Sequence, residues 1–275
     1  MSIGGTSIEQ ALASLSDMTG GMVAIGKDEH AQRIARAQDF MREQGIAAIY
    51  LNAGANLTYF TGTKWYASER MVGAILPASG DIEYIAPAFE ESTLQGFMLV
   101  AGRVNCWEEH ESPYQLFVDV LARMGIAQDA AAPPRVGICE SAAFFIYDGI
   151  KPLAPGYALE NARAVTAYCR SRKSEAEIAL MQRVMDMTLA VHVATASMLY
   201  EGITTVEVEE FIQRAHRKVG APRSYFCIVL FGEATAYPHG VNYVQTLKAG
   251  DTVLIDTGCQ VMNYISDITR TYVFG

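Results

Sequence analysis

Two aspartates near the end of the sequence, Asp256 and Asp267, have the residue type and spacing for hydrolytic chemistry. They lie in two apolar stretches that can pair as a β-hairpin turning near residues 261–263. Such a hairpin would place the carboxylates almost opposite each other on one face, with Cβ atoms about 4.5–5.5 Å apart. Like charges that close either take up a proton or hold cations between them. Two metal ions about 3.5–4 Å apart would suit the gap and activate a water for hydrolysis. Hairpin geometry alone leaves open that each aspartate is only a strand-end or turn residue.

Two capping boxes indicate the helices that would support this hairpin. Ser174 is followed three residues later by Glu177, and Thr204 by Glu207, so each pair can satisfy the free amide donors at a helix start. Residues 174–275 are therefore predicted to form a domain of two helices followed by three strands, at 225–231, 252–258 and 264–274. The face shared by apolar residues of the first helix is predicted to comprise Ile178, Met181, Met185, Leu189, His192, Ala196 and Leu199.

The rest of the chain predicts a second domain and two connecting segments. A length of 275 residues exceeds one average domain of roughly 100–200 residues. Residues 28–160 alternate helical stretches with short apolar runs, which is typical of a mixed α/β domain. Residues 1–27 are expected to be a flexible lead with at most one loose helix. Residues 161–173 are expected to be a linker, because four cations lie among few bulky apolar residues.

Composition excludes several classes of function. The formal net charge of −9 repels phosphate backbones, so nucleic acid is not an expected partner. The five cysteines are odd in number and lack a C-x-x-C pair, which argues against a disulfide framework or a structural zinc site and favours a reducing compartment. No signal peptide or membrane-spanning run is recognised, and a soluble, cytoplasmic protein without membrane contact is expected.

The hairpin sequence resembles a known family. The residues of this hairpin read LIDTGCQVMNYISDITRTYVFG, which is similar to the first metal hairpin of the prolidase and aminopeptidase P family, the pita-bread metallopeptidases. The resemblance implies two divalent ions, often manganese, cobalt or zinc, held by two Asp, one His and two Glu. Asp256 and Asp267 match the two Asp positions. The segment FGEATAYPHG resembles the one that brings a non-coordinating histidine to the substrate, which implies a catalytic and substrate-binding role for His239.

The resemblance also implies a fold and an activity. The segments NLTYFTGTKWYASER and SRKSEAEIALMQ resemble the family's N-terminal domain and the entry to its catalytic domain. The implied fold is α/β, with a ribonuclease-H-like N-terminal domain followed by an incomplete pita-bread domain. The implied substrates are dipeptides or longer peptides with an Xaa-Pro bond, and relatives usually form homodimers. In such relatives the region of Arg70 can approach the partner's active site, so Arg70 is either a surface residue or a contact to the substrate carboxylate.

The matching residues stop before the family's remaining ligands, which follow the Asp-x-Thr-Arg-Thr strand. We therefore expect the 275-residue chain alone to bind metal weakly and to be an inactive fragment; full, chelator-sensitive peptidase turnover would overturn this. Two rival interpretations stay open. A creatinase-like amidinohydrolase shares the fold but works without metal and lacks the aspartate pair. A non-catalytic relative would use the fold only for binding or assembly.

Two further histidines receive other interpretations. His192 lies on an apolar helix face and is predicted to be a packed core residue with a single hydrogen bond. His216 lies among Arg214, Arg217 and Lys218 and is predicted to be part of a solvated basic face.

Overall fold

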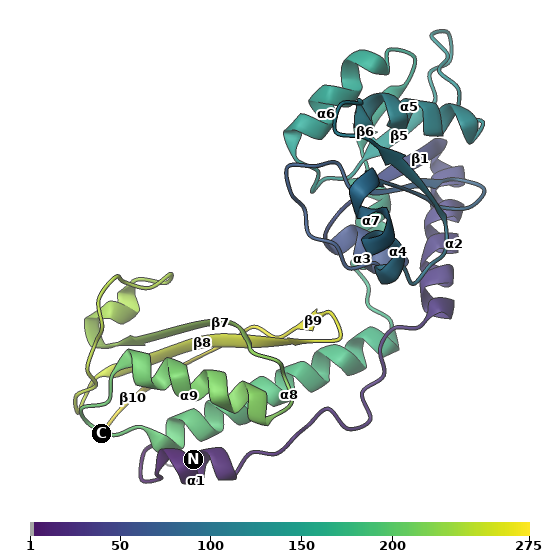
Figure 1. Cartoon of the computed structure of the whole chain (residues 1–275). Helices are drawn as coiled ribbons and strands as arrows, with labels where there is room; N and C mark the ends of the chain where they lie inside the picture. The colour runs from purple at the N-terminus through teal and green to yellow at the C-terminus, as the bar shows by residue number, and fades with distance from the viewer. Residues whose placement is uncertain (1–2) are drawn as a thin grey trace. The chain divides into compact units, whose positions relative to one another are not determined.

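The computed structural model describes residues 3–275, which form two compact units (Figure 1). One unit comprises Ile25–Lys173, and the other comprises Ser174–Gly275 together with the N-terminal segment up to Ala24. Each unit has its own hydrophobic core. Among the helices within residues 3–275, none combines the length and the apolar character that a membrane crossing requires.

The unit Ile25–Lys173 is a mixed α/β sandwich with helices on both faces of one sheet. Its six strands have the order β4-β3-β2-β1-β5-β6. The strands are β1 Ile46–Asn52, β2 Gly73–Pro77, β3 Glu83–Pro87, β4 Arg103–Trp107, β5 Arg135–Ile138 and β6 Ala158–Asn161. The helices are α2 Lys27–Gln44, α3 Ala55–Thr61, α4 Glu91–Phe97, α5 Pro113–Arg123, α6 Phe144–Ile150 and α7 Arg163–Arg170, with short 3₁₀ turns η1 Ala88–Glu90 and η2 Lys151–Leu153.

Alternation along the strands divides this core into two layers. On β1, Ile49 and Leu51 pack with residues of α2, α3, α4 and α7, whereas Tyr50 faces the layer formed by α5 and α6. Gly45 ends α2 in the left-handed conformation, with φ 67°, as expected of a glycine C-cap. β2 and β3 pair antiparallel. The α/β class expected for this part of the chain is confirmed.

The expected linker at residues 161–173 is wrong, because most of it is the helix α7. Val165 and Cys169, one helical turn apart, are fully buried against the core that α2 also lines. Of the four cations that suggested a solvated connection, Arg163 and Arg170 lie on this helix, and Arg172 and Lys173 follow its end; Arg163 is exposed. A short helix with only two buried apolar residues has too weak a periodic pattern to be recognised in a stretch with four cations.

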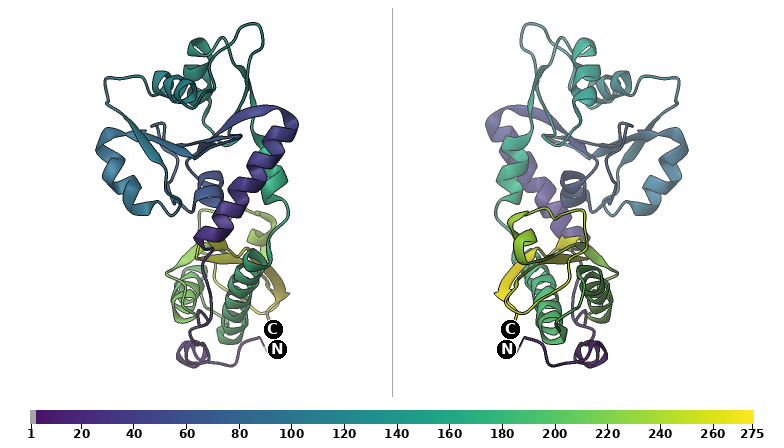
Figure 2. Two further views of the ribbon diagram at one scale, coloured as in Figure 1. Left: turned by 90° about the vertical axis from the view of Figure 1, so that its right-hand side faces the viewer. Right: turned by 90° about the vertical axis from the view of Figure 1, so that its left-hand side faces the viewer.

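The second unit is a sheet covered by helices on one side. Its strands have the order β10-β8-β7, with the short β9 paired to β8. Figures 1 and 2 show α8 and α9 on one face of this sheet, where α8 packs on β8 and α9 on β7. Its elements are α1 Ile8–Ala13, α8 Glu175–Met198, α9 Thr205–Lys218, β7 Ser224–Phe231, η3 Gly232–Ala236, β8 Thr252–Val261, β9 Tyr264–Ile265 and β10 Ile268–Val273.

The N-terminal segment differs from the flexible lead expected for residues 1–27. Ala11 of α1 and the following Leu15 are buried in the core of the second unit. The backbone N–H of Gly4 donates to the carbonyl of Ala196 at 2.8 Å, which fastens the segment to the end of α8. Apolar residues at helical spacing give this short segment one face to bury, so it is ordered by packing rather than by intrinsic helix propensity.

The buried face of α8 is rotated from the predicted one. Ile178, assigned to the core from the sequence, is 54% exposed. Apolar side chains occupy neighbouring stripes of this helix, so periodicity predicts the helix but not which stripe faces inward. The stripe that packs in the core comprises Val184, Met187, Val191, Ala194 and Met198.

Both predicted capping boxes are present, and the second provides a stability test. Thr204 Oγ1 accepts from the N–H of Glu207 at 3.3 Å, and the Glu207 carboxylate accepts from the N–H of Thr204 at 2.9 Å. Thr204→Ala leaves these groups without their partners and should lower the free energy of unfolding by about 1 kcal/mol in a urea titration. Thr204→Ser keeps the hydroxyl and should unfold as the native chain does; an equal loss in both variants would contradict the role of the cap.

Candidate metal centre

Asp256 lies at the middle of the central strand of the second sheet. It pairs with Thr269 of β10 on one side and with Ile228 of β7 on the other. Its neighbours Ile255 and Thr257 are fully buried on the side of α8 and α9. Because successive side chains alternate along a strand, Asp256 points to the opposite, open face of the sheet.

Asp267 lies on the same hairpin but not directly opposite Asp256. The pairs Gln260↔Ile265 and Thr257↔Ile268 share one register, which sets Asp267 across from Gly258. The expected face-to-face pair is therefore wrong by two residues. Positions 256 and 267 are therefore diagonal in this register, and diagonal neighbours of an antiparallel pair have Cα atoms about 7–8 Å apart. A longer gap between carboxylates still leaves room for cations.

The turn between the strands fixes this register. Met262 and Asn263 both have positive φ, 49° and 69°, as the two central residues of a type I′ turn require. A two-residue turn at 262–263 pairs Val261 with Tyr264, and counting outward gives the diagonal relation of the aspartates. The sequence indicated the turn. The register, however, depends on the exact number of residues in that turn.

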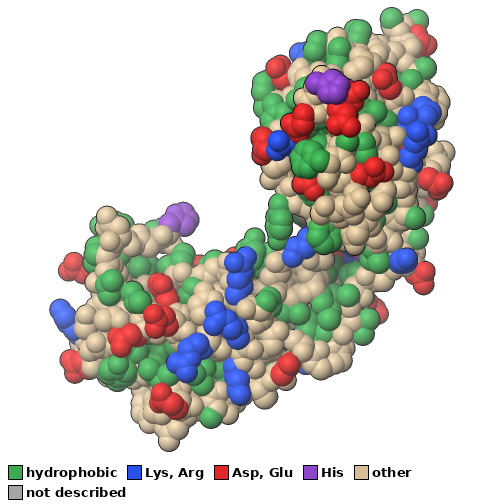
Figure 3. Space-filling model, viewed as in Figure 1, with side chains coloured by type: hydrophobic (Ala, Val, Ile, Leu, Met, Phe, Trp, Pro, Cys, Tyr) green, Lys and Arg blue, Asp and Glu red, His purple; other side chains and the backbone are tan. Residues whose placement is uncertain are grey.

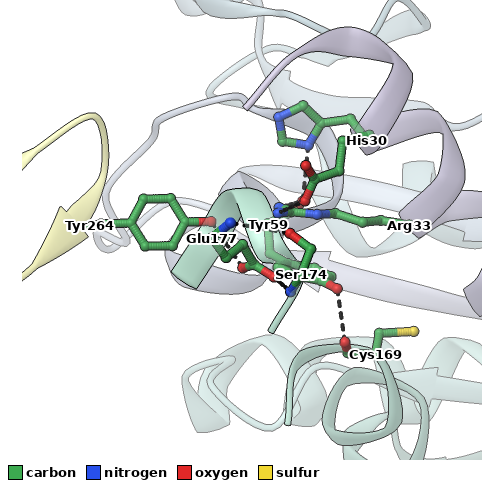
Figure 4. A network of polar contacts seen from close by, with 8 residues as sticks. His30, Arg33, Tyr59, Cys169, Ser174, Glu177 and Tyr264 are labelled. Atoms are coloured by element: carbon green, nitrogen blue, oxygen red, sulfur yellow. Dashed lines mark hydrogen bonds and ion pairs between the residues drawn. The ribbon is translucent and has the colours of Figure 1, made fainter. Parts of the chain in front are cut away.

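The turn is also tied to the helix layer by a polar contact. Tyr264 of β9 donates from its hydroxyl to Glu177 Oε1 at 2.9 Å (Figure 4). Glu177 is buried and accepts from the backbone N–H of Ser174 with its other oxygen at 3.0 Å. The capping box that begins α8 thereby also holds the hairpin, a second role that the sequence pattern did not reveal.

The electrostatics of Asp256 fit a bound cation. Its Oδ1 is buried, yet no hydrogen-bond partner for it is present within residues 3–275. A buried carboxylate oxygen without a partner is costly, since such oxygens are normally hydrogen-bonded or coordinated. A divalent ion on the open face would supply the missing interaction, and carboxylate oxygens are preferred ligands of hard divalent ions. The two aspartates therefore fit as part of the ligand set of a divalent metal.

Within the part of the chain that the structure describes, no group of three or more His, Cys, Asp or Glu side chains is arranged to hold a metal. Asp267 is exposed, and no hydrogen bond or ion pair of its carboxylate is recorded for residues 3–275. The two aspartates are thus available as ligands without competing partners.

Comparison with known proteins identifies the family to which this arrangement belongs. Residues 33–172 match the Creatinase/Prolidase N-terminal domain, and residues 179–275 match Metallopeptidase family M24. The chain belongs to the creatinase/prolidase family. The pita-bread resemblance of the hairpin is thereby confirmed, as is the fold class of both domains.

Individual members of the creatinase/prolidase family extend beyond the aligned region. A putative dipeptidase of Bacillus subtilis is 30% identical over 247 residues, covering 88% of this chain and 66% of the relative. An uncharacterized peptidase of Schizosaccharomyces pombe is 30% identical over 264 residues, and the chain spans 56% of its length. Among solved structures, dipeptidase PepE of Mycobacterium ulcerans superposes with a TM-score of 0.81 at 26% identity, over 92% of this chain and 67% of that one. A prolidase of Thermococcus sibiricus gives 0.78 at 26% identity, over 91% and 67%.

His239 lies on an exposed turn of the same unit. The N–H of Gly240 donates to the carbonyl of Tyr237 at 2.9 Å, which closes a turn with Pro238 and His239 at its centre. Gly240 follows with φ +93°, a conformation that favours glycine. Figure 1 shows the segment after η3 on the side of the sheet away from α8 and α9, which is the face that carries Asp256. The role of His239 in the creatinase/prolidase chemistry stays a prediction.

Arg70, the other predicted substrate contact, lies in the N-terminal unit and is engaged in ion pairs. Its Nε donates to Glu109 Oε1 at 2.8 Å, a second nitrogen contacts Glu69, and its guanidinium lies 5.3 Å from the ring centre of Phe89. The hydrogen bond that Arg70 donates to Glu109 raises the pKa of Arg70 above its ordinary value. Both carboxylates are exposed, so these pairs are weak and a substrate carboxylate could replace them. Contact with substrate stays a prediction.

His192 is a core residue, as predicted. It is 5% exposed, and its Nε2 lies 2.9 Å from the carbonyl oxygen of Ile268, next to Asp267 in sequence. Burial lowers the pKa of His192, while the carbonyl of Ile268 and the charge of Asp256 act in the opposite direction. His192 therefore braces the start of β10 from the helix side.

The solvated environment predicted for His216 is wrong. The cations beside it, Arg217 and Lys218, are exposed, and Figure 3 shows Lys and Arg side chains gathered on this side of the unit. His216 itself is fully buried, with Nδ1 2.7 Å from Ser224 Oγ and Nε2 3.3 Å from Thr188 Oγ1. Helical position decides between these environments, because His216 follows the buried Ile212 by one turn.

Proposed function

We propose that this chain forms part of a two-metal Xaa-Pro peptidase that cleaves dipeptides or short peptides. The observation that carries the proposal is the buried, unpaired Oδ1 of Asp256 on the open face of the sheet. Membership of the creatinase/prolidase family and the names of the similar proteins, dipeptidases and prolidases, support the same chemistry.

In this proposal, the residues of the chain bind the ions and orient the substrate. Asp256 and Asp267 supply carboxylate oxygens to the ions, which when bound polarise the scissile carbonyl and lower the pKa of a water. His239 donates a hydrogen bond from its ring to the carbonyl oxygen of the scissile bond and stabilises the charge that develops there. Pro238 and Gly240 shape the turn that presents this ring. Arg70 contacts the carboxylate end of the substrate.

Several finer features are part of the proposal; the metal and the assembly rest on the family, and the location rests on the cysteine pattern of the sequence. They are manganese, cobalt or zinc as the metal, assembly as a homodimer, and a location in the cytoplasm. Two aspartates provide only some of the four to six ligands that such ions take, so further ligands complete the site.

Hydrolysis of matched substrates tests the proposed function. The protein as its gene encodes it is treated with a chelator and reloaded with Mn²⁺, Co²⁺ or Zn²⁺, and is then given an Xaa-Pro dipeptide, the matching Xaa-Ala dipeptide and creatine. We expect cleavage of Xaa-Pro that the chelator abolishes and one of the metals restores, with little cleavage of Xaa-Ala. Chelator-insensitive hydrolysis of creatine would support an amidinohydrolase instead. Absence of turnover with every substrate and metal would favour a binding or scaffold role.

A further inference from the structure

The residue before Asp267 is anchored in the core on the other side of the sheet. Ser266 is fully buried, and its Oγ lies 2.7 Å from Thr188 Oγ1 of α8. The same Oγ accepts the backbone N–H of Cys259 at 2.8 Å. Because neighbouring side chains alternate across a strand, the inward position of Ser266 directs Asp267 to the open face.

The hydroxyl of Ser266 replaces a backbone group in the strand pairing. In a hydrogen-bonded antiparallel pair, two residues exchange both backbone bonds. The N–H of Ser266 donates to the carbonyl of Cys259 at 2.9 Å, but the N–H of Cys259 donates to the serine side chain. The Ser266 carbonyl instead lies over Gly258, where an added Cβ would be 1.8 Å from its oxygen. This irregularity separates β9 from β10 at 266–267 and so determines where Asp267 leaves the sheet.

A buried chain of polar side chains holds the hydroxyl of Ser266. Thr188 Oγ1 also lies 3.3 Å from His216 Nε2, and His216 Nδ1 lies 2.7 Å from Ser224 Oγ at the start of β7. Each of these residues is at most 4% exposed. Burial lowers the pKa of His216 to about 4, so the neutral ring offers one donor and one acceptor to its two hydroxyl neighbours. The chain links α8, α9 and β7 to the residue next to Asp267.

We propose that Ser266, held by Thr188, is a positioning residue for Asp267 in metal binding. This inference rests on the proposed function, since it assigns the buried hydroxyls to the same metal centre. Residues that orient metal ligands typically contribute 10–100-fold to metal affinity. Ser266→Ala leaves the N–H of Cys259 without its acceptor, and Thr188→Val removes the hydroxyl that orients Ser266 while keeping the side-chain shape. Each change should weaken Mn²⁺ binding about tenfold.

Binding of Mn²⁺ is measured by NMR, from the paramagnetic broadening of amide signals of β8 and β10 during a titration. The compared proteins are the native protein and the variants Ser266→Ala, Thr188→Val, Thr188→Ser and Asp267→Asn. Thr188→Ser keeps the hydroxyl and loses only the methyl group, so it should bind as the native protein does. A packing role of Thr188 would instead make the serine variant at least as weak as the valine variant, and that result would overturn the inference.

The remaining outcomes separate the inference from the function on which it rests. If the native protein shows no broadening around Asp256 and Asp267, the proposed function fails. If Asp267→Asn loses binding but Ser266→Ala and Thr188→Val bind as the native protein does, the positioning role fails and the function stands. The amide spectrum reports whether each variant is folded. Should Ser266→Ala unfold, the valine and serine variants of Thr188 decide the question.

Discussion

Replacing Asp256 or Asp267 with asparagine should lower kcat/KM for an Xaa-Pro dipeptide by roughly 10³-fold or more, because a neutral amide is a poor ligand for the ions that polarise the substrate. Loss of a metal ligand removes several kcal/mol of transition-state stabilisation, and about 4 kcal/mol corresponds to 10³-fold. The measurement is steady-state hydrolysis by the protein as its gene encodes it, at saturating Mn²⁺. Asp251→Asn is the matched control, since Asp251 accepts the N–H of Lys248 at 2.9 Å just before β8 and should keep full activity.

Stability without metal distinguishes a ligand from a structural carboxylate. The Oδ1 of Asp256 is buried without a partner within residues 3–275, so its charge contributes no stabilising hydrogen bond there. Asp256→Asn should therefore leave the metal-free melting temperature unchanged or raise it, while abolishing any increase on adding Mn²⁺. A variant that melts lower in the absence of metal and still hydrolyses the dipeptide would contradict the assignment.

Local signals in the sequence predicted the elements well, and long-range geometry was predicted less well. A capping box depends on residues three apart, so Thr204 and Glu207 could be recognised without any knowledge of the fold. The position of Asp256 relative to Asp267 depends on the exact number of residues in the turn. An error of one residue in the register moves a side chain to the other face of the sheet. An error of two residues keeps the side chain on the same face but changes its cross-strand partner. The facing pair was therefore wrong, and the expectation that both carboxylates point to one face stays a prediction.

The polar chain behind Asp267 could not be found from spacing. Ser224, His216 and Thr188 come from three separate elements and Ser266 from the segment between β9 and β10, and none forms a recognisable motif with another. In the sequence, His216 has cations as its neighbours, and only tertiary packing turns it inward. The useful signal was the periodicity of α9, in which position 216 continues the buried stripe of Ile212. If the periodicity is applied to His216 as well as to the apolar residues of α9, it predicts that this histidine is buried.

Burial of His216 makes the stability of the second unit sensitive to acid. Its pKa is lowered to about 4 by loss of hydration, with a smaller contribution of the same sign from His192, whereas an exposed histidine has an ordinary value of 6.5. The unfolded chain therefore binds a proton between pH 6.5 and 4 that the folded chain does not. The stabilisation is fully present above pH 6.5 and is lost as the pH falls toward 4, amounting to about 3 kcal/mol in total.

Urea unfolding at several pH values checks this expectation. NMR signals of β8 report the second unit, because both tryptophans, Trp65 and Trp107, lie in the other one. His216→Gln keeps a donor and an acceptor but cannot titrate. Between pH 6.5 and 4 its free energy of unfolding should therefore fall less steeply than that of the native protein, and the two slopes should differ by up to about 1.4 kcal/mol per pH unit. His110→Gln changes an exposed histidine of the other unit and should keep the native slope. Two results would contradict this expectation. If the free energy of unfolding of His216→Gln depends on pH as that of the native protein does, the acid sensitivity comes from carboxylates. If the His216 ring titrates near pH 6.5 by NMR, the ring is hydrated rather than enclosed.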